Sequence, residues 1–299
     1  MKHLRLVRGG LRWLALACGL AGLVAAARAD ALDEVRQRGV LRVGVKADMP
    51  LWGLRDPASG RIEGLEPDLV ADLARRLGVQ LALVGLETQD KVRAVQEGRV
   101  DLALATMSDT QERRDQLALV LPHYYASATA VMSHRQQAFA AWDDLRNRRV
   151  CARRGSSVNR LVTVTYGADL VALYSNTQAL AALRDGRCDA LLYEDVGIAA
   201  LLAQPSWRRD FEMALPPRYE TAWAIALPLA EAGGRLAQRV SGAVADWHRS
   251  GLLLALERKW GVPPSSFAVR MNRLWQRRAS DGRWYCGETV ATVTPKECL

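Results

Sequence analysis

Few residues of this 299-residue chain have the types and spacing that catalysis requires. The four histidines, His3, His123, His134 and His248, are scattered and form no H-E-x-x-H motif that would hold a metal. The segment Gly155-Ser156-Ser157 is not a G-x-S-x-G nucleophile elbow. The chemistry that remains is the recognition of polar groups. We therefore predict a protein that is not an enzyme and that has no metal or cofactor.

Two places combine residue types that can bind an anionic group. Arginine can donate two parallel hydrogen bonds to a carboxylate, and Arg113 follows the end of a predicted strand, where the first amides of a helix add donors. Gly155 has no side chain, so neighbouring backbone amides can approach an anion closely, and Ser156 and Ser157 follow it. Taken alone, one arginine among 36 is more typical of a solvated surface, and an ordinary turn before a helix explains Gly155-Ser156-Ser157 equally well.

The first 29 residues have the layout of a secretory signal peptide. A basic start precedes an apolar run from Trp13 to Ala27, and Ala27-Arg28-Ala29 provides a small-x-small cleavage site. The run is shorter than the roughly 20 apolar residues that span a bilayer. Cys18 raises the alternative of a lipoprotein, but it lies in the middle of the run, where a lipobox is poorly formed. We expect export to the periplasm by a cleavable leader.

Removal of this leader lowers the net charge of the protein. The leader contains five basic and no acidic residues, so the net charge falls from +9 to +4. No block of Lys and Arg interleaved with aromatic residues remains, which argues against a nucleic-acid partner. The 49% hydrophobic and 24% charged residues are typical of a globular domain.

Four cysteines follow the leader, Cys151, Cys188, Cys286 and Cys298. An even number in an oxidising compartment favours disulfides, and the spacing matches neither a zinc site nor a C-x-x-C redox motif. Four cysteines allow three pairings. The segment from Asp281 to Leu299 is polar and rich in turns, so we expect a crosslink between the two cysteines near its ends.

The chain after the leader alternates predicted strands with amphipathic helices. This alternation indicates an α/β fold with a mostly parallel sheet and helices on its faces. Pro67 suits a first helical turn and Gly78 a helix end. The predicted strands are Leu41–Val45, Val100–Ala105 and Arg149–Ala152, and the predicted helices are Pro67–Leu77, Lys91–Glu97 and about Gln238–Trp260.

A loose internal duplication indicates two similar units. Glu97–Leu104 recurs as Asp185–Leu192, and in both copies a helix stops at a glycine before an apolar strand begins. Two such units predict two lobes, with a ligand between them at the carboxyl ends of the strands. Helix–glycine–strand junctions are common, so coincidence stays an equal alternative on the residues alone.

Six motifs follow one another in a familiar order from about Val40 to Pro264. They are Leu41–Val45 with Pro50-Leu51-Trp52, Gly60–Leu69, Gly98–Asp101 with Thr110–Arg113, Leu121–Tyr124, Gly155–Ser157, and Cys188–Ala190 with Glu194. In this order they resemble the family 3 solute-binding proteins of ABC importers, which are periplasmic receptors for polar amino acids.

The resemblance implies a two-lobed type II periplasmic binding protein that closes about two crossover strands. We expect the crossovers near Tyr125–Thr129 and Thr221–Ile225. The expected partners are a small amino acid and an inner-membrane ABC permease, and we expect a monomer. The expected domains are a signal peptide 1–29, lobe 1 at 30–125 and 222–275, lobe 2 at 126–221, and a cysteine-containing extension at 276–299.

The resemblance also assigns roles to site residues. Arg113 would bind the ligand carboxylate, and Thr106, Ser108, Ser156 and Ser157 would add donors. Glu194 occupies the place where the family has an aspartate for the α-ammonium group. Because glutamate is one methylene longer, either the ligand sits differently, Asp195 substitutes, or the ligand lacks a standard amino group.

The closest resemblance is to the glutamate/aspartate branch, through Pro263-Pro264 and Met271-Asn272. That branch has cations where Lys46 and Lys91 occur, a further contact near Asn176, and an acidic ligand. Trp52 is a candidate wall of the pocket by stacking. Exposed lysines and a core tryptophan are the alternatives. Receptors of the general amino-acid branch have cysteines at the positions of Cys151 and Cys188, which implies that these two pair.

Two other functions remain open. The same fold resembles periplasmic cyclohexadienyl dehydratases, in which a carboxylic acid in the cleft is the general acid, and Glu194 would take that role. A sensor or partner-binding module without a membrane anchor is the other alternative.

Overall fold

The computed structural model describes residues 30–290 and 294–299. The predicted leader therefore lies outside the described residues. Helix α1 (Ala31–Arg38) begins where the side chain of Asp30 accepts a hydrogen bond from the amide of Leu32. Within the described part of the chain, no helix is both long and apolar enough to cross a membrane.

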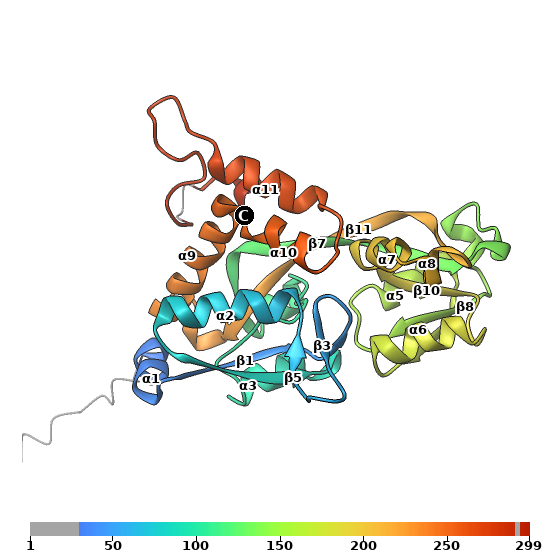
Figure 1. Ribbon diagram of the computed structural model, residues 1–299, viewed down its shortest axis with the longest axis horizontal. Coiled ribbons are helices and arrows are strands. Elements are labelled where there is room, and N and C mark those ends of the chain that lie inside the picture. Colours follow the sequence, from blue (N-terminus) through green and yellow to red (C-terminus); the bar gives the residue numbers. More distant parts are fainter. Residues whose placement is uncertain (1–29, 291–293) are drawn as a thin grey trace, which may run out of the picture.

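One large sheet of eight strands forms the centre, in the order β5-β1-β6-β11-β7-β10-β8-β9. Two long antiparallel strands, β7 (Leu117–His134) and β11 (Phe211–Pro228), lie in its middle. Parallel strands flank them on each side, and Figure 1 shows β7 and β11 running between two bodies. The flanking strands are β1 (Val40–Lys46), β5 (Gln80–Leu86) and β6 (Leu102–Ala103), and β8 (Arg149–Arg153), β9 (Asp169–Leu173) and β10 (Ala190–Glu194).

We call the body around β1, β5 and β6 lobe 1 and the body around β8, β9 and β10 lobe 2. Helices cover the sheet in both, so the predicted α/β fold class is confirmed. Lobe 1 contains α1, α2 (Leu65–Leu77), α3 (Lys91–Gln96), α4 (Gln111–Arg114), α9 (Arg235–Ser250), α10 (Leu252–Lys259), α11 (Ser266–Gln276) and a small sheet of β2 (Asp48–Met49), β3 (Gly53–Arg55) and β4 (Ile62–Glu63). Lobe 2 contains α5 (Asn159–Tyr166), α6 (Asn176–Arg184), α7 (Asp195–Ala203) and α8 (Pro205–Arg208).

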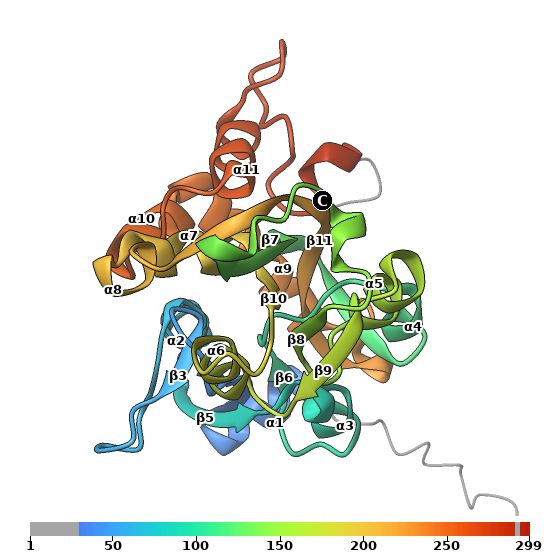
Figure 2. The ribbon, with the colours of Figure 1, turned by 90° about the vertical axis from the view of Figure 1, so that its right-hand side faces the viewer.

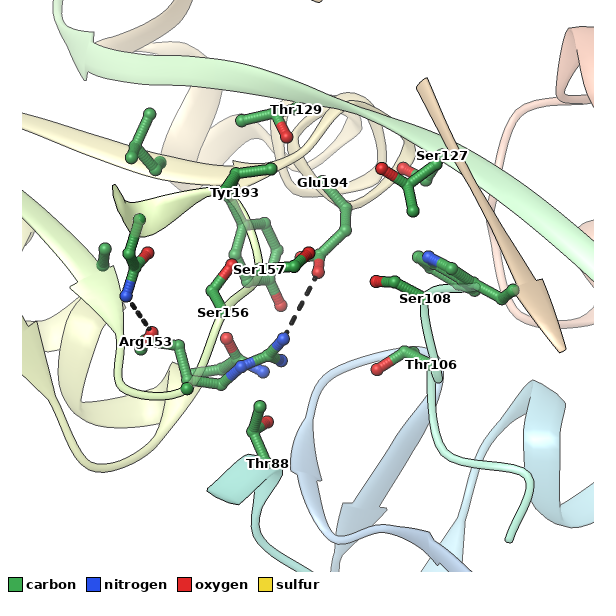
Figure 3. Close-up of a pocket in the computed structure, with 18 of the residues that line it drawn as sticks. Thr88, Thr106, Ser108, Ser127, Thr129, Arg153, Ser156, Ser157, Tyr193 and Glu194 are labelled. Carbon is green, nitrogen blue, oxygen red and sulfur yellow. Dashed lines mark hydrogen bonds and ion pairs between the residues drawn. The ribbon is translucent and has the colours of Figure 1, made fainter. Parts of the chain in front are cut away.

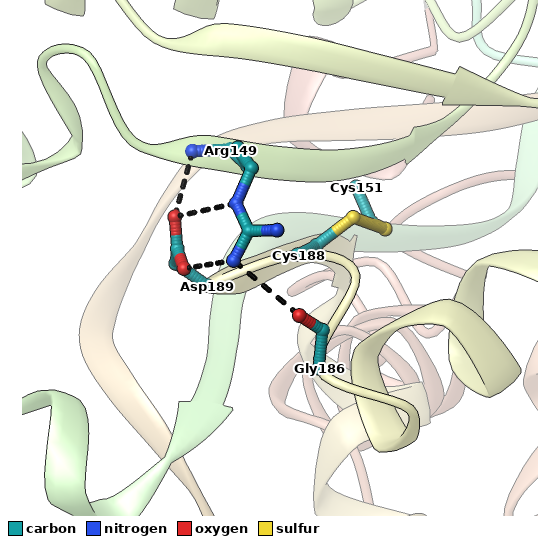
Figure 4. Close-up of a disulfide and its surroundings, with 5 residues drawn as sticks. All are labelled: Arg149, Cys151, Gly186, Cys188 and Asp189. Carbon is teal, nitrogen blue, oxygen red and sulfur yellow. Dashed lines mark hydrogen bonds and ion pairs between the residues drawn. A yellow bond between two sulfur atoms is a disulfide. The ribbon is translucent and has the colours of Figure 1, made fainter.

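The duplicated segments have the same local structure. Gly98 and Gly186 end helices α3 and α6 with φ of +66° and +68°, a left-handed conformation that favours glycine. Three residues later, an aspartate pairs with the first residues of a neighbouring strand. The Asp101 carboxylate accepts a hydrogen bond from the Arg42 amide at 2.8 Å, and Asp189 accepts one from the Arg149 amide at 2.9 Å. Each aspartate also binds the guanidinium group of the same arginine, and Figure 4 shows the Asp189–Arg149 pair.

Two predicted elements differ from the structure. The strand expected over Val100–Ala105 is regular only at Leu102–Ala103, because the chain leaves the sheet to form the loop that contains Thr106. The single helix expected over Gln238–Trp260 is two helices, α9 and α10. Gly251 separates them with φ of +74°, which an α-helix cannot contain.

Both predicted disulfides are present. Cys151–Cys188 joins β8 to the turn before β10 (Figure 4). Cys286–Cys298 closes the segment after α11, which Figures 1 and 2 show beside α11 at the outer end of lobe 1. The guanidinium group of Arg249 in α9 donates hydrogen bonds to the carbonyl groups of Gly287 and Glu288 in this segment. The extension is thus fixed to lobe 1.

Candidate functional site

A cavity lies between the two lobes, at the carboxyl ends of the strands of lobe 2 (Figure 3). Eight of the ten predicted ligand-binding residues line it, and both lobes contribute. These eight are Lys91, Thr106, Ser108, Arg113, Ser156, Ser157, Asn176 and Glu194. The polar and aromatic lining residues that sequence reasoning missed are Thr88, Ser127, Thr129, Arg153, Asn159, Tyr193, Thr221 and Trp223.

Arg113 is held in the cavity wall by the short helix α4. Thr110 caps this helix, and its hydroxyl accepts a hydrogen bond from the Arg113 amide at 3.3 Å. The Arg113 guanidinium group donates to the carbonyl group of Ser108 at 2.8 Å and has no ion pair with a described residue. Burial lowers the pKa of Arg113, and the nearby charge of Arg153 lowers it further. An anion in the cavity would form an ion pair with the Arg113 guanidinium group.

A buried network shapes the loop that contains Thr106. Thr106 has φ of +46°, and its amide donates to the Glu66 carboxylate at 2.7 Å and to the Tyr124 hydroxyl at 3.0 Å. The Lys91 ammonium group donates to the carbonyl groups of Ala105 and Thr106 at 2.8 and 2.9 Å. Burial raises the pKa of Glu66 to about 7 and lowers the pKa of Lys91 well below its ordinary value. The network fixes this loop and turns the Thr106 side chain toward the cavity (Figure 3).

The turn after β8 forms the opposite wall. Gly155 has φ of +77°, and a Cβ atom there would meet the backbone of Gln89 in lobe 1 at 3.4 Å. The Arg153 carbonyl group accepts hydrogen bonds from the Ser156 amide at 3.2 Å and from the Asn159 side chain at 2.9 Å. Glycine therefore allows this left-handed turn, whereas a Cβ atom would make only an ordinary contact with Gln89.

Glu194 ends strand β10 and faces Arg153. The closest atoms of their ion pair, Arg153 Nη2 and Glu194 Oε1, are 3.7 Å apart (Figure 3). Arg153 is only 8% exposed, and its Nε atom has no hydrogen-bond partner within residues 30–290 and 294–299. The available signal for Arg153 was its place at the end of a predicted strand directly before the Arg154-Gly155 turn, because ligands bind at the carboxyl ends of parallel strands.

Asp195 does not substitute for Glu194. Its Oδ1 atom accepts hydrogen bonds from the hydroxyl of Ser127 at 2.6 Å and from the amides of Ala128 and Val196 at 3.0 and 2.8 Å. Asp195 is also not among the residues that line this cavity. It joins α7 to the crossover strand β7, which is a structural role.

Two other expectations need correction, because Lys46 and Trp52 lie behind the cavity wall. The Lys46 ammonium group is fully buried and pairs with Asp48 at 2.5 Å, with further bonds to Thr88 and the Leu86 carbonyl group. Trp52 is 0% exposed. It packs with Tyr125 and Trp223 at centroid distances of 4.6 and 4.8 Å. Of these three aromatic residues, Trp223 is the one that lines the cavity.

The lobes touch each other beside the cavity. The Asp48 carboxylate of lobe 1 accepts a hydrogen bond from the Asn176 amide of lobe 2 at 3.0 Å. The Thr177 hydroxyl donates to the Asp48 carbonyl group at 3.2 Å. We expected Lys46 to bind the ligand. It instead neutralises the Asp48 carboxylate, which accepts a hydrogen bond from the first residue of helix α6.

Around the cavity lie five buried polar atoms that have no hydrogen-bond partner among the described residues. Each belongs to a residue of the lining, and they come from both lobes. They are Thr106 Oγ1, Arg153 Nε, Asn159 Oδ1, Asn176 Nδ2 and Tyr193 Oη. An unsatisfied buried polar group costs about 1–3 kcal/mol, so this concentration is typical of a site that a polar ligand completes. Among the described residues, no group of His, Cys, Asp and Glu side chains is arranged to hold a metal ion.

Comparison with known proteins agrees with this geometry. The family described as "Bacterial extracellular solute-binding proteins, family 3" matches residues 41–263. The glutamine-binding protein of Geobacillus stearothermophilus is 25% identical over 184 residues, which cover 60% of this chain and 70% of that protein. The L-cystine-binding protein TcyJ of Escherichia coli K12 is 24% identical over 264 residues, which cover 87% of this chain and 97% of that protein.

A solved structure shares the fold. The solute receptor for L-cysteine of Neisseria gonorrhoeae superposes with a TM-score of 0.69 at 27% identity, and the match covers 76% of this chain and 92% of that one. None of these three proteins is named for glutamate or aspartate. The closer resemblance to the glutamate/aspartate branch therefore stays a prediction.

Proposed function

Because the chain belongs to the family 3 bacterial extracellular solute-binding proteins, we propose that it is the periplasmic receptor of an ABC importer for a polar amino acid. The main support is the set of five unpaired polar atoms around a cavity between two lobes. A ligand with donors and acceptors at both ends would satisfy them.

In this proposal the ligand spans the cavity from lobe to lobe. Arg113 binds the α-carboxylate, since its guanidinium group has no ion pair with a described residue, whereas Arg153 pairs with Glu194 and Lys91 already donates to two carbonyl groups. Thr106 and Ser108 add hydrogen bonds. Glu194 accepts the α-ammonium group. The cations Lys91, Arg113 and Arg153 outnumber the single lining carboxylate, which favours an acidic amino acid within the polar class.

Binding proceeds by closure about β7 and β11, the strands that pass between the lobes. The ligand first meets one lobe, and the contacts of Asp48 with Asn176 and Thr177 then hold the lobes together. The closed form is presented to an inner-membrane permease by a monomeric receptor. We keep the domain boundaries stated from the sequence, and export through the leader 1–29, as part of this proposal.

The test is calorimetry of the purified mature protein with L-glutamate, L-aspartate, L-glutamine, L-histidine and L-arginine. Arg113→Gln should weaken binding of the preferred ligand by about tenfold or more, because a charge-assisted pair to the carboxylate contributes roughly 1.5–3 kcal/mol. Arg114→Gln is the matched control, since Arg114 is exposed and pairs with Asp109 outside the cavity.

Equal loss of affinity in both variants, or no amino acid bound by the wild type, would contradict the proposal. A mass spectrum of the ligand that co-purifies with the protein identifies it without prior assumption. Both measurements use the folded protein, which circular dichroism of each variant checks.

A dehydratase activity is the second candidate, because glutamate stands where the family has aspartate. Glu194 faces the guanidinium group of Arg153 at 3.7 Å, which is the arrangement of an ion pair, whereas a general acid has to hold a proton. We therefore expect no turnover of prephenate or arogenate. Formation of an aromatic product from either one, followed by its ultraviolet absorbance, would favour the enzyme.

A further inference from the structure

Arg153 is a buried cation for which an ordinary α-amino acid provides no partner. Its guanidinium group is enclosed by lobe 2 and by Met49 of lobe 1, whose sulfur atom lies 4.0 Å from Nη1. Its one ion pair among the described residues is the 3.7 Å contact with Glu194. The Nε atom donates to no group in the part of the chain that the structure describes. A burial of this kind is costly unless the charge is paired and its donors are satisfied.

Some charged groups of the cavity lining already have partners within the protein, and the others are available to a ligand. The ammonium group of Lys91 donates to two carbonyl groups, and the Glu66 carboxyl group lies in the same buried network. Arg113, Arg153 and Glu194 remain, that is, two cations and one anion. The complement of this set is a molecule with two carboxylates and one ammonium group.

Other nearby carboxylates are not available to Arg153. Asp48 pairs with Lys46 and accepts the Asn176 amide. Glu87 is not part of the cavity lining, and although the charge of Arg153 acts on it, the two form no ion pair among the described residues. Once a ligand ammonium group takes Glu194, Arg153 therefore needs an anion from the ligand itself.

We propose that Arg153 is the specificity-determining residue of the site and selects an acidic side chain by binding the second carboxylate of the ligand. The inference rests on the proposed amino-acid receptor function. It replaces the expectation that Lys46 selects the acidic group, since Lys46 lies behind the wall with its own carboxylate partner.

The electrostatics of the cavity agree with this assignment. Burial lowers the pKa values of Arg113, Lys91 and Lys46, and in each case the charge of Arg153 lowers the value further. The four cations thus repel one another across a small space. A ligand with an extra negative charge between Arg113 and Arg153 removes part of this repulsion, whereas a neutral side chain does not.

L-Glutamate and L-glutamine have nearly the same shape and differ in the charge of the side chain, so they form the test pair for calorimetry. The wild type should bind glutamate about tenfold or more tightly than glutamine, in line with a charge-assisted hydrogen bond. Arg153→Gln should bring the two affinities to within about threefold of each other, mainly by loss of glutamate affinity. L-Aspartate provides a shorter acidic ligand for the same comparison.

Arg154→Gln is the matched control, because Arg154 is the next residue, is exposed and does not line the cavity. It should keep the wild-type preference. Glutamine bound as tightly as glutamate by the wild type, or an unchanged preference in Arg153→Gln, would overturn the inference and leave the receptor function standing. Failure to bind any amino acid would overturn both.

Discussion

Two pairs of adjacent arginines show that residue type alone does not define a role in this chain. Arg113 and Arg153 line the cavity, whereas Arg114 and Arg154, the residues that follow them, are exposed. The difference is one of direction from the backbone. A short helix turns Arg113 inward, and the last position of strand β8 does the same for Arg153.

At the same scale, Glu66 predicts a dependence of stability on pH. Its pKa is raised by burial from the ordinary 4.5 to about 7 in the folded state, so the folded protein binds more protons than the unfolded one between these values. The free energy of unfolding should therefore fall as pH rises from about 4.5 to 7, by on the order of 2–3 kcal/mol from this group. Chemical denaturation at several pH values measures it.

The Glu66→Gln variant should remove this part of the pH dependence, because the amide keeps an acceptor for Tyr124 and the Thr106 amide but does not titrate. Glu63→Gln, at an exposed position that pairs with Arg61, should leave the slope as in the wild type. If the Glu66 variant has the wild-type slope, the assignment is wrong.

At the scale of elements, the two Gly-Arg-x-Asp junctions, Gly98–Asp101 in lobe 1 and Gly186–Asp189 in lobe 2, have the same structural role. Each aspartate accepts a backbone amide at the start of a parallel strand and binds the guanidinium group of the same residue, Arg42 or Arg149. The junctions therefore set the register at the amino ends of the strands, at the opposite end from the cavity. In lobe 2 the Cys151–Cys188 disulfide reinforces this end.

Loss of that disulfide should lower stability. The bond spans 37 residues, and for a loop of this length the chain-entropy argument gives about 4 kcal/mol. The Cys151→Ser/Cys188→Ser variant should therefore unfold at a lower urea concentration than the wild type. Its preference among ligands should stay unchanged, because both cysteines lie outside the cavity lining.

Cys286→Ser/Cys298→Ser is the comparison variant, since that bond spans only 12 residues in the extension. We expect a smaller loss there, about 3 kcal/mol by the same argument. A larger effect in the extension than in lobe 2 would show that the entropy of the unfolded chain does not explain these bonds.

At the scale of the whole molecule, the structure places the two lobes in contact beside the cavity. The hydrogen bond from the Thr177 hydroxyl to the Asp48 carbonyl group connects α6 of lobe 2 with β2 of lobe 1. Thr177 does not line the cavity, so its contribution to binding would come from closure rather than from contact with the ligand.

Thr177→Val keeps the shape of the side chain and removes this bond. A hydrogen bond contributes about 0.5–1.5 kcal/mol, so ligand affinity should fall roughly 2- to 12-fold while the preference among ligands stays the same. Calorimetry gives the affinity, and small-angle X-ray scattering of the ligand-free and bound protein gives the extent of closure.

Thr165→Val is the control, because Thr165 is exposed on α5 of lobe 2. Unchanged affinity in Thr177→Val would show that this contact does not contribute to the closed state.

The sequence by itself determined the fold class, the repeated helix–glycine–strand unit, the pairing of the cysteines through the family resemblance, and eight of the residues around the cavity. These follow from local patterns, namely the periodicity of apolar residues, glycine at helix ends and the order of motifs.

Only the tertiary structure decided which charges face the ligand. Lys46 and Asp48 are two residues apart and form an ion pair within lobe 1. The hydrogen bond from the Asn176 amide to Asp48 depends on how lobe 2 meets lobe 1. Arg153 and Glu194 are 41 positions apart and meet because β8 and β10 are parallel neighbours that end at the same edge. Such partners, distant in the sequence, decide whether a charged side chain is paired within the protein or can bind a ligand. A local sequence pattern does not identify these partners.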